Sequence, residues 1–247
     1  MLVAWNNCVV PNDGSVTEIN SSATVCGGLT SITIPDSVTD IGSGAFRSCS
    51  ELASVTILGS LKYIKQGAFE NCRNLKEITI IGSVFYIADN AFSGCSSLTE
   101  ITMLGNVTSI RSYAFRNCPV EIATVPAYAL KYINNPSLKK VVISCGYSIG
   151  EDALRGCSSL TELTISNSVD SIGNNAFRGC SGLTEITIPD SVYTIGDYAF
   201  AFCSGLTKLT ISNRIKSISD NMLRGCTGLT SVDIPNSVTS IGNIKMC

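Results

Sequence analysis

The 247-residue sequence contains no histidine. This absence excludes Ser-His-Asp and Cys-His nucleophile systems and H-E-x-x-H zinc sites. There are 12 cysteines, yet no two of them form a C-x-x-C pair, the close spacing that zinc sites commonly use. The sequence also lacks a phosphate-binding glycine loop and a dinucleotide-binding fingerprint. We therefore expect no metal, no cofactor and no enzymatic activity.

Charge and long apolar runs are scarce as well. Charged residues make up 15% of the chain and the net charge is −2, so no basic field is available for nucleic acid or an anionic membrane. No apolar run approaches the roughly 18 residues of a membrane-spanning helix. Residues 1–7 lack the pattern of a signal peptide, and no anchor is visible. We expect no nucleic-acid binding and no membrane insertion, and the chain is either intracellular or a region of something longer.

What the sequence does contain is a 23-residue repeat. Cysteines recur at that interval in two series, namely Cys26, Cys49, Cys72, Cys95 and Cys118, then Cys157, Cys180, Cys203 and Cys226. The frame around them is C-x-x-L-x-x-I-x-I-x-x-x-V-x-x-I-x-x-x-A-F-x-x-C. A period of 23 is typical of leucine-rich repeats. The alternation Ile32-Thr33-Ile34 predicts a short strand with one buried face.

The rest of each copy predicts how the chain returns. Pro35-Asp36, or a glycine in other copies, ends the strand. Val38 and Ile41 suit a second strand on the opposite wall, and Gly44-Ala45-Phe46 suits one helical turn at the corner. One copy cannot enclose its own apolar side chains, whereas stacked copies can. The sequence therefore predicts a repeat solenoid with parallel strands.

We expect this solenoid to occupy residues 26–247, preceded by a degenerate rung or cap at residues 1–25. Residues 119–136 carry three prolines and do not fit the frame. They are interpreted as an insertion or a distorted rung, with a boundary between two domains as the alternative. The C-terminal rung stops before its Ala-Phe, and such an end is compatible with a fragment or with end-to-end self-association.

Nine cysteines share one frame position, which is compatible with metal binding, with disulfides or with a structural role. Metal binding needs converging ligands, which one thiol per rung does not provide. Disulfides remain an alternative, since rungs about 4.8 Å apart lie within the Cα range of a bridge. The favoured interpretation is a small, buried, apolar side chain at a tight corner. Cys8, Cys145 and Cys247 lie off this series and are the expected reactive thiols.

Two columns of side chains should face solvent on the strand surface. They give the candidate partner-binding residues, which are the threonines Thr79, Thr102, Thr164 and Thr187 and the glutamates Glu77, Glu100, Glu162 and Glu185. Like charges on adjacent rungs destabilise a sheet, which suggests an acidic stripe for a basic partner or a cation. The alternative is an ordinary solvated face, on which charges repel only weakly. A retaining glycosidase also pairs carboxylates about 5 Å apart, but an open face offers it no pocket.

A third recurrent side chain is an arginine between the Phe or Leu position and the cysteine. It predicts a basic outer ridge or a solvated corner, formed by Arg47, Arg116, Arg155, Arg178 and Arg224.

Segments such as "AFRGCSGLTEITIPDSV" and "IPDSVYTIGDYAF" resemble the BspA-type, or Treponema-like, leucine-rich repeats over roughly residues 26–243. The resemblance implies an arc-shaped solenoid with strands on the concave wall and short strands on the convex wall. It also implies a surface or secreted protein that mediates adhesion, for example to extracellular-matrix proteins. The function expected on this basis is a non-enzymatic adhesin-type module that binds a protein of a host or neighbouring cell. The alternatives are a self-assembling surface element and an intracellular scaffold.

Overall fold

The fold is a parallel β-solenoid of about ten turns with the predicted 23-residue period. The computed structural model describes residues 10–21 and 26–243. These fall into two compact units, residues 1–120 (unit 1) and 121–247 (unit 2), and each is described by itself. The ends at 1–9 and 244–247, with Cys8 and Cys247, lie outside the described residues, as do residues 22–25.

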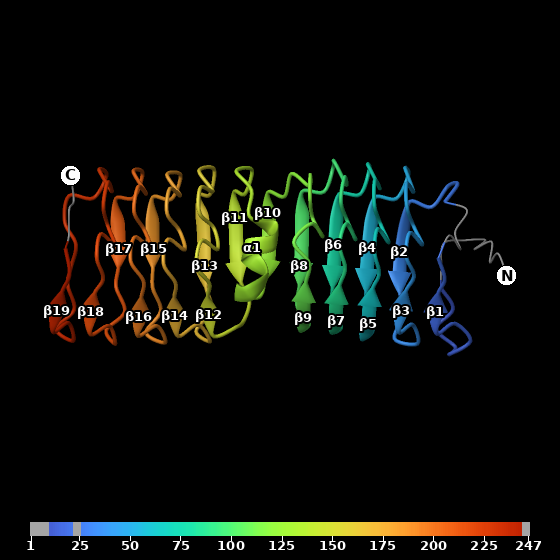
Figure 1. Cartoon of the computed structure of the whole chain (residues 1–247), viewed down its shortest axis with the longest axis horizontal. Helices are drawn as coiled ribbons and strands as arrows, with labels where there is room; N and C mark the ends of the chain where they lie inside the picture. The colour runs from blue at the N-terminus through green and yellow to red at the C-terminus, as the bar shows by residue number, and fades with distance from the viewer. Residues whose placement is uncertain (1–9, 22–25, 244–247) are drawn as a thin grey trace. The chain divides into compact units, whose positions relative to one another are not determined.

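Unit 1 is built from two parallel sheets, visible from blue to green in Figure 1. The first sheet contains the long strands β2 (Ser31–Ile34), β4 (Ser54–Ile57), β6 (Glu77–Ile80) and β8 (Glu100–Met103). The second contains β1 (Glu18–Ile19), β3 (Asp40–Ile41), β5 (Leu61–Ile64), β7 (Val84–Ile87) and β9 (Val107–Ile110). Neighbouring strands pair residues 23 apart, as Ile32 with Val55 and Ile78 with Ile101. The predicted frame therefore sets the register.

Unit 2 begins with β10 (Ile122–Val125), which pairs with β11 (Lys140–Ile143), and β11 pairs with β13 (Glu162–Ile165). The later long strands are β15 (Glu185–Thr187) and β17 (Lys208–Thr210). The opposite wall contains β12 (Ser148–Ile149), β14 (Ser171–Ile172), β16 (Thr194–Ile195), β18 (Ser217–Ile218) and β19 (Ser240–Ile241).

The irregular stretch 119–136 supplies a rung of its own kind. Its strand β10 has Ala123 and Val125 buried. A 3-10 turn (Ala127–Ala129) and the short helix α1 (Leu130–Ile133) then follow, and they bury Leu130 and Ile133. Three prolines suit this path, because proline cannot donate a hydrogen bond to a sheet.

The core of each unit is a set of stacked columns of identical side chains. Phe46, Phe69, Phe92 and Phe115 stack with ring centroids 4.9, 5.1 and 5.2 Å apart and nearly parallel planes. In unit 2, Phe177 and Phe200 repeat the arrangement at 5.3 Å. The leucine and isoleucine positions of most rungs are also buried, whereas Ile234 and Ile241 near the C-terminus are 41% and 57% exposed. This stacking explains the repetition, since each rung covers the apolar face of the next.

The Ala-Phe corner differs from the predicted helical turn. It consists of two successive hydrogen-bonded turns, in which Arg47 N–H donates to Gly44 O and Cys49 N–H donates to Phe46 O. Between them, Phe46 N–H donates to Ala68 O of the next rung at 2.7 Å. A helix would have used that N–H within its own turn. Bonding to the next rung is preferred because it extends the stack.

The corner between the two strands of a rung takes two forms. Where the sequence reads Pro-Asp, as at Pro35, a turn closes with Val38 N–H donating to Pro35 O, and the second strand has two residues. Where the sequence reads aliphatic-Gly, as at Ile81-Gly82, backbone hydrogen bonds to the neighbouring rungs continue through the corner. The second strand of such a rung has four residues. Three consecutive rungs of unit 1 have this second form.

Candidate functional site

The outward face of the long strands in unit 1 brings together four of the predicted site residues. Glu77 and Glu100 are direct register partners on β6 and β8, and so are Thr79 and Thr102. Both glutamates are exposed, whereas both threonines are half-buried. Among the described residues, neither glutamate has an ion-pair partner. Two carboxylates on adjacent rungs therefore repel each other, with no ion pair to either of them.

The equivalent face of unit 2 carries a different charge pattern. Glu162 is the register partner of Lys140 and forms a 2.8 Å ion pair with it. Glu185 is the register partner of Lys208, with a closest N–O distance of 3.8 Å. Thr164 and Thr187 are exposed beside them. The predicted acidic stripe is thus offset by lysines in unit 2 and unopposed in unit 1.

Three apolar residues on the unit 1 face were missed by the sequence interpretation. Leu58, Ile81 and Leu104 follow β4, β6 and β8 and are 40%, 47% and 60% exposed. Ile81 N–H donates to Ile57 O and Leu104 N–H donates to Ile80 O, so the ladder between rungs extends to this row. The sequence does show the difference: this frame position is aliphatic in these three copies, whereas it is Pro35 in an earlier copy and Pro189 in a later one.

The predicted arginine ridge is largely engaged within the chain. Arg47 forms an ion pair with Glu70, and Arg155 forms one with Asp152 at 3.3 Å. The remaining three lie over aromatic rings at 5.2–5.9 Å from the ring centroid, which are Arg116 over Tyr113, Arg178 over Tyr198 and Phe202, and Arg224 over Phe202. These local contacts make the ridge a weaker candidate for a partner than the strand face.

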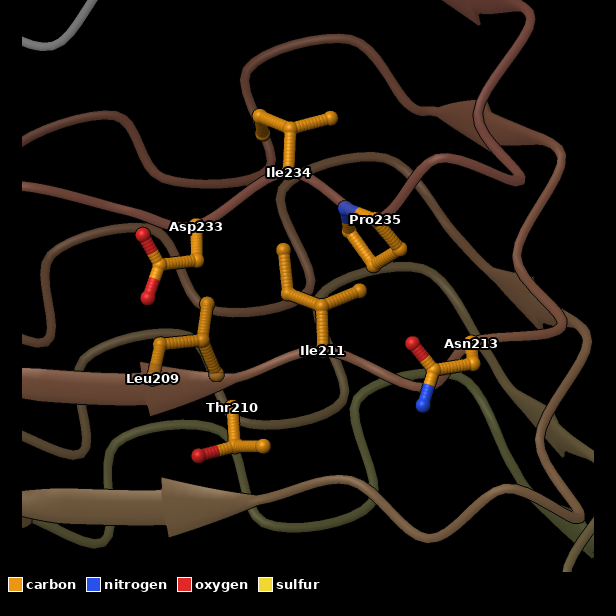
Figure 2. A pocket seen from close by; sticks show the side chains of 7 residues that line it. All are labelled: Leu209, Thr210, Ile211, Asn213, Asp233, Ile234 and Pro235. Atoms are coloured by element: carbon orange, nitrogen blue, oxygen red, sulfur yellow. The ribbon is translucent and has the colours of Figure 1, made fainter.

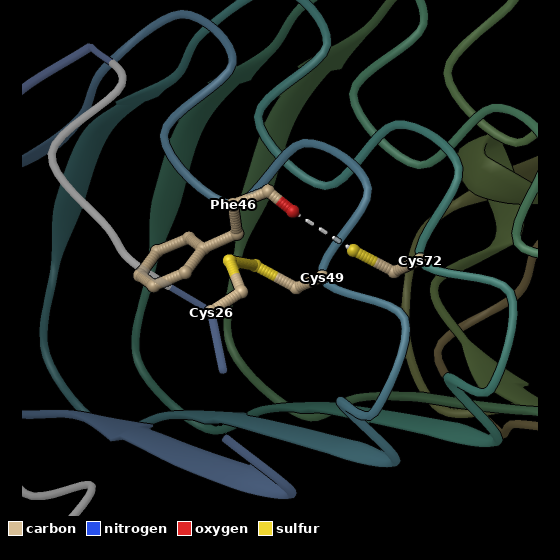
Figure 3. Close-up of a disulfide and its surroundings, with 4 residues drawn as sticks. All are labelled: Cys26, Phe46, Cys49 and Cys72. Atoms are coloured by element: carbon tan, nitrogen blue, oxygen red, sulfur yellow. Dashed lines mark hydrogen bonds between the residues drawn. A yellow bond between two sulfur atoms is a disulfide. The ribbon is translucent and has the colours of Figure 1, made fainter. Parts of the chain in front are cut away.

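The cysteine column has a polar role beyond its small size. The Cys72 thiol donates to the Phe46 carbonyl of the preceding rung at 3.0 Å, as Figure 3 shows. The same bond, 26 residues back, recurs at Cys95, Cys118, Cys180, Cys203 and Cys226, with distances of 3.1–3.2 Å. Cys157 instead donates to Asn134 Oδ1 at 3.0 Å, because its preceding rung is the irregular one. Cysteine thus combines a small apolar volume with a weak donor.

Burial keeps the thiols of Cys157, Cys180, Cys203 and Cys226 protonated, whereas a hydrogen bond with the Cys95 thiol lowers the pKa of Cys72. Burial raises the pKa of Cys157 and Cys203 to about 12 and that of Cys226 to about 11, and it raises the pKa of Cys180 further. A neutral thiol is a poor nucleophile and a poor metal ligand. Among the described residues, no three histidine, cysteine or acidic side chains are grouped to hold a metal ion.

One part of the cysteine prediction is wrong. Cys26 and Cys49 are joined by a disulfide, with Cα atoms 5.0 Å apart, next to the stacked Phe46 (Figure 3). The favoured interpretation was an unbridged apolar side chain, and this pair follows the alternative of a disulfide. The Cα spacing of these adjacent rungs is within the bridging range. Off the column, Cys145 is exposed and free, as expected of a reactive thiol.

Unit 2 also contains a cavity of about 220 Å³ beside β17. Figure 2 shows the aliphatic side chains of Leu209, Ile211 and Ile234 between the polar Asn213 and Asp233. Segment 231–235 has the sequence of a strand but does not form one, which leaves this space beside β17. None of the predicted site residues lines it. No helix in the described part of the chain has the length and apolarity needed to cross a membrane.

Comparison with known proteins places this architecture. The model of the BspA type leucine rich repeat region (6 copies) matches residues 17–141 and 127–245. No curated protein sequence matches the chain. A leucine-rich repeat protein from Bacteroides ovatus is 24% identical with a TM-score of 0.55, over 92% of this chain and 72% of that one.

Two further solved structures are similar. A leucine rich cell surface protein from Faecalibacterium prausnitzii is 26% identical with a TM-score of 0.36, over 94% of this chain and 76% of that one. The receptor in the TLR13–ssRNA13 complex is 15% identical with a TM-score of 0.55, over 93% of this chain but 34% of its own length. The RNA is a property of that complex. At this identity the likeness shows the fold alone.

Proposed function

Because the chain belongs to the BspA-type leucine-rich repeat family, we propose that it is a non-enzymatic protein-binding module of the adhesin type. Its partner is a surface or matrix protein of a host or neighbouring cell, and the module acts at a cell surface or in secreted form. Repeat solenoids of this kind typically bind proteins through an extended strand face. The binding surface is the outward face of the long strands, with Glu77, Glu100, Thr79 and Thr102 at its centre.

The observation that carries this proposal is the unopposed pair Glu77 and Glu100. Two exposed carboxylates in direct register cost stability, and among the described residues neither of them forms an ion pair. A basic partner would remove the repulsion on binding and would be steered to the face by it. The pair Glu162 and Glu185 belongs to the same proposed surface but contributes less, because lysines already offset it.

The test is binding to a panel of immobilised matrix, serum and cell-surface proteins, using the intact chain and two charge-reversed variants. The first variant is Glu77→Lys with Glu100→Lys, and the matched variant is Glu162→Lys with Glu185→Lys. Both change the net charge equally, and both place lysine where the repeat already has Lys140 and Lys208. The four glutamates are exposed, and exposed ion pairs contribute little to stability, so neither variant should unfold.

We expect the chain to bind a panel protein with an affinity that falls as salt rises. The Glu77 and Glu100 reversal should weaken this binding by about tenfold or more, and the matched reversal by less. Equal binding by all three proteins would reject the acidic face as the site. Absence of binding to every panel protein would reject the adhesin proposal.

A further inference from the structure

Unit 1 presents an apolar row and an acidic pair on one face. We name the row Leu58, Ile81 and Leu104 the apolar ledge. Along each strand the inward and outward positions alternate, so Glu77, Thr79 and Ile81 share the outward face of one rung. On the next rung the same face carries Glu100, Thr102 and Leu104. Each rung thus runs from a carboxylate through a threonine to an aliphatic side chain.

Within the outward strand segments of unit 1 the charge has a single sign, and the exposed Lys76 lies directly before Glu77. Segments 54–58, 77–81 and 100–104 contain only two charged residues, Glu77 and Glu100. A ligand that covers all three rungs therefore meets apolar contact at one border and, on two of the rungs, negative charge at the other. Its complement is a segment with one apolar side and one basic side.

The apolar ledge is specific to unit 1. The equivalent positions of unit 2 include Ser144, Ser166 and Pro189, which offer no comparable aliphatic row. Ordinary exposed apolar residues are scattered singly, whereas these three lie on consecutive rungs joined by backbone hydrogen bonds. An ordered apolar row beside charged residues is typical of an interaction surface.

The spacing of the row favours a helix as the bound element. Adjacent rungs are about 4.8 Å apart, and a helix repeats its apolar side every turn, about 5.4 Å. Same-side residues of an extended segment come about 6.6 Å apart and would lose register within three rungs. The acidic pair lies four residues from the ledge, about 13 Å along a strand, close to the 10–12 Å diameter of a helix with its side chains.

We propose that this face of unit 1 binds a basic amphipathic helix of its protein partner, with the helix lying across β4, β6 and β8. The apolar side of the helix packs on the ledge, its lysines or arginines pair with Glu77 and Glu100, and the threonines form the floor beneath it. The proposal rests on the proposed function and names the chemistry of the partner. As in helix-in-groove recognition, the anchors of the helix recur every three or four residues, but the strand face takes the place of the groove.

The probe is a synthetic helix of leucine and lysine with all leucines on one side, and its counterpart carries glutamate in place of lysine. Binding is measured by fluorescence anisotropy. The ledge variant combines Leu58→Ser, Ile81→Ser and Leu104→Ser, and it should fold because the repeat already tolerates Ser144 and Ser166 there. The matched control is Phe85→Ser, which removes a 56% exposed hydrophobic residue from β7 in the other sheet of unit 1.

We expect the lysine helix to bind at least about tenfold more tightly than the glutamate helix. The ledge variant and the Glu77→Lys, Glu100→Lys variant should each lose about tenfold or more, while Phe85→Ser keeps its affinity. Unchanged binding by the ledge variant, or an equal loss in Phe85→Ser, would overturn the proposal.

The panel assay separates this inference from the proposed function. A panel protein whose binding is lost on charge reversal but kept by the ledge variant would support the proposed function and overturn the helix proposal. Ledge-dependent binding of the lysine helix without any panel partner would support the helix proposal and reject the adhesin role.

Discussion

At the scale of single residues, the recurring cysteine is explained by two needs at one position. The corner has room for only a small side chain, and the carbonyl of the preceding rung can accept a second hydrogen bond there. The Cys95 thiol meets both needs by donating to Phe69 O at 3.2 Å. Alanine would fit into the corner but could not donate a hydrogen bond, and serine would place a more polar group in the core. The periodicity revealed the small size, whereas the donor role could be seen only once the rungs were stacked.

The thiols should differ sharply in reactivity. In a pulse of iodoacetamide at pH 8, Cys145 should be alkylated in the native protein, because it is exposed. The buried Cys95, Cys180 and Cys203 should react at least about a hundredfold more slowly, since alkylation requires local opening and a thiolate. Peptide mapping by mass spectrometry measures each site, and a denatured sample and a Cys145→Ser variant are the controls. Rapid native labelling of Cys180 would contradict the buried column.

At the scale of the element, the corner between the two strands decides how far the ladder extends. At Gly59, Gly82 and Gly105 successive corners stack so closely that a Cβ on Gly82 would lie well inside 3.0 Å of the Gly59 carbonyl oxygen. Only glycine permits this approach. The second strands of these rungs have four residues for that reason, and the apolar ledge lies directly before the glycines.

Gly82→Ala should therefore destabilise the protein by about 2 kcal/mol or more, because backbone rather than a movable side chain blocks the new methyl group. The comparison is Gly150→Ala, where a Cβ would meet nothing within 4 Å. Urea unfolding followed by circular dichroism gives both free energies. An equal effect of the two substitutions would show that the corners are not tightly stacked.

Strand positions and register followed from the sequence because a two-residue alternation repeated every 23 residues allows one inward face. The pairing of Ile32 with Val55 is the direct result. The corner at Phe46 was predicted wrongly, because the same residues are compatible with a helical turn and with two successive hydrogen-bonded turns. The ledge was missed because its frame position varies between copies, with prolines in some and Leu58 or Ile81 in others. A consensus frame keeps only the positions that recur. The lysine partners of Glu162 and Glu185 were in the sequence, but side-chain pairing is settled only by geometry.

At the scale of the whole molecule, a solenoid is stabilised chiefly between nearest rungs. The same type of side chain is then buried at the same position of many rungs, and the small contribution of each rung to stability adds up. In unit 2 the thiols of Cys157 and Cys203 are both buried, and burial raises the pKa of each to about 12 from an ordinary value of 9.0. The folded state therefore holds these protons more tightly than the unfolded state does.

The sign of the pH dependence follows from that difference. Below pH 9.0 both states are protonated and the stabilisation is fully present. As the pH rises from 9.0 toward about 12, the unfolded chain ionises while the folded chain does not, so stability is lost. Each thiol contributes about 1.4 kcal/mol per pH unit in this window, so at pH 10 these two thiols together should lower the free energy of unfolding by about 3 kcal/mol.

Urea unfolding between pH 7 and pH 10.5, under anaerobic conditions, measures this loss. Tyrosine and lysine ionisation also act at high pH, so the control is the Cys157→Ala, Cys203→Ala variant. It should be less stable at pH 7, because each site loses a packed sulfur atom and its hydrogen bond. Its stability should nevertheless fall less steeply above pH 9, and the two curves should converge. Parallel curves would mean that the two thiols ionise as readily in the folded chain as in the unfolded one, which the buried column does not allow.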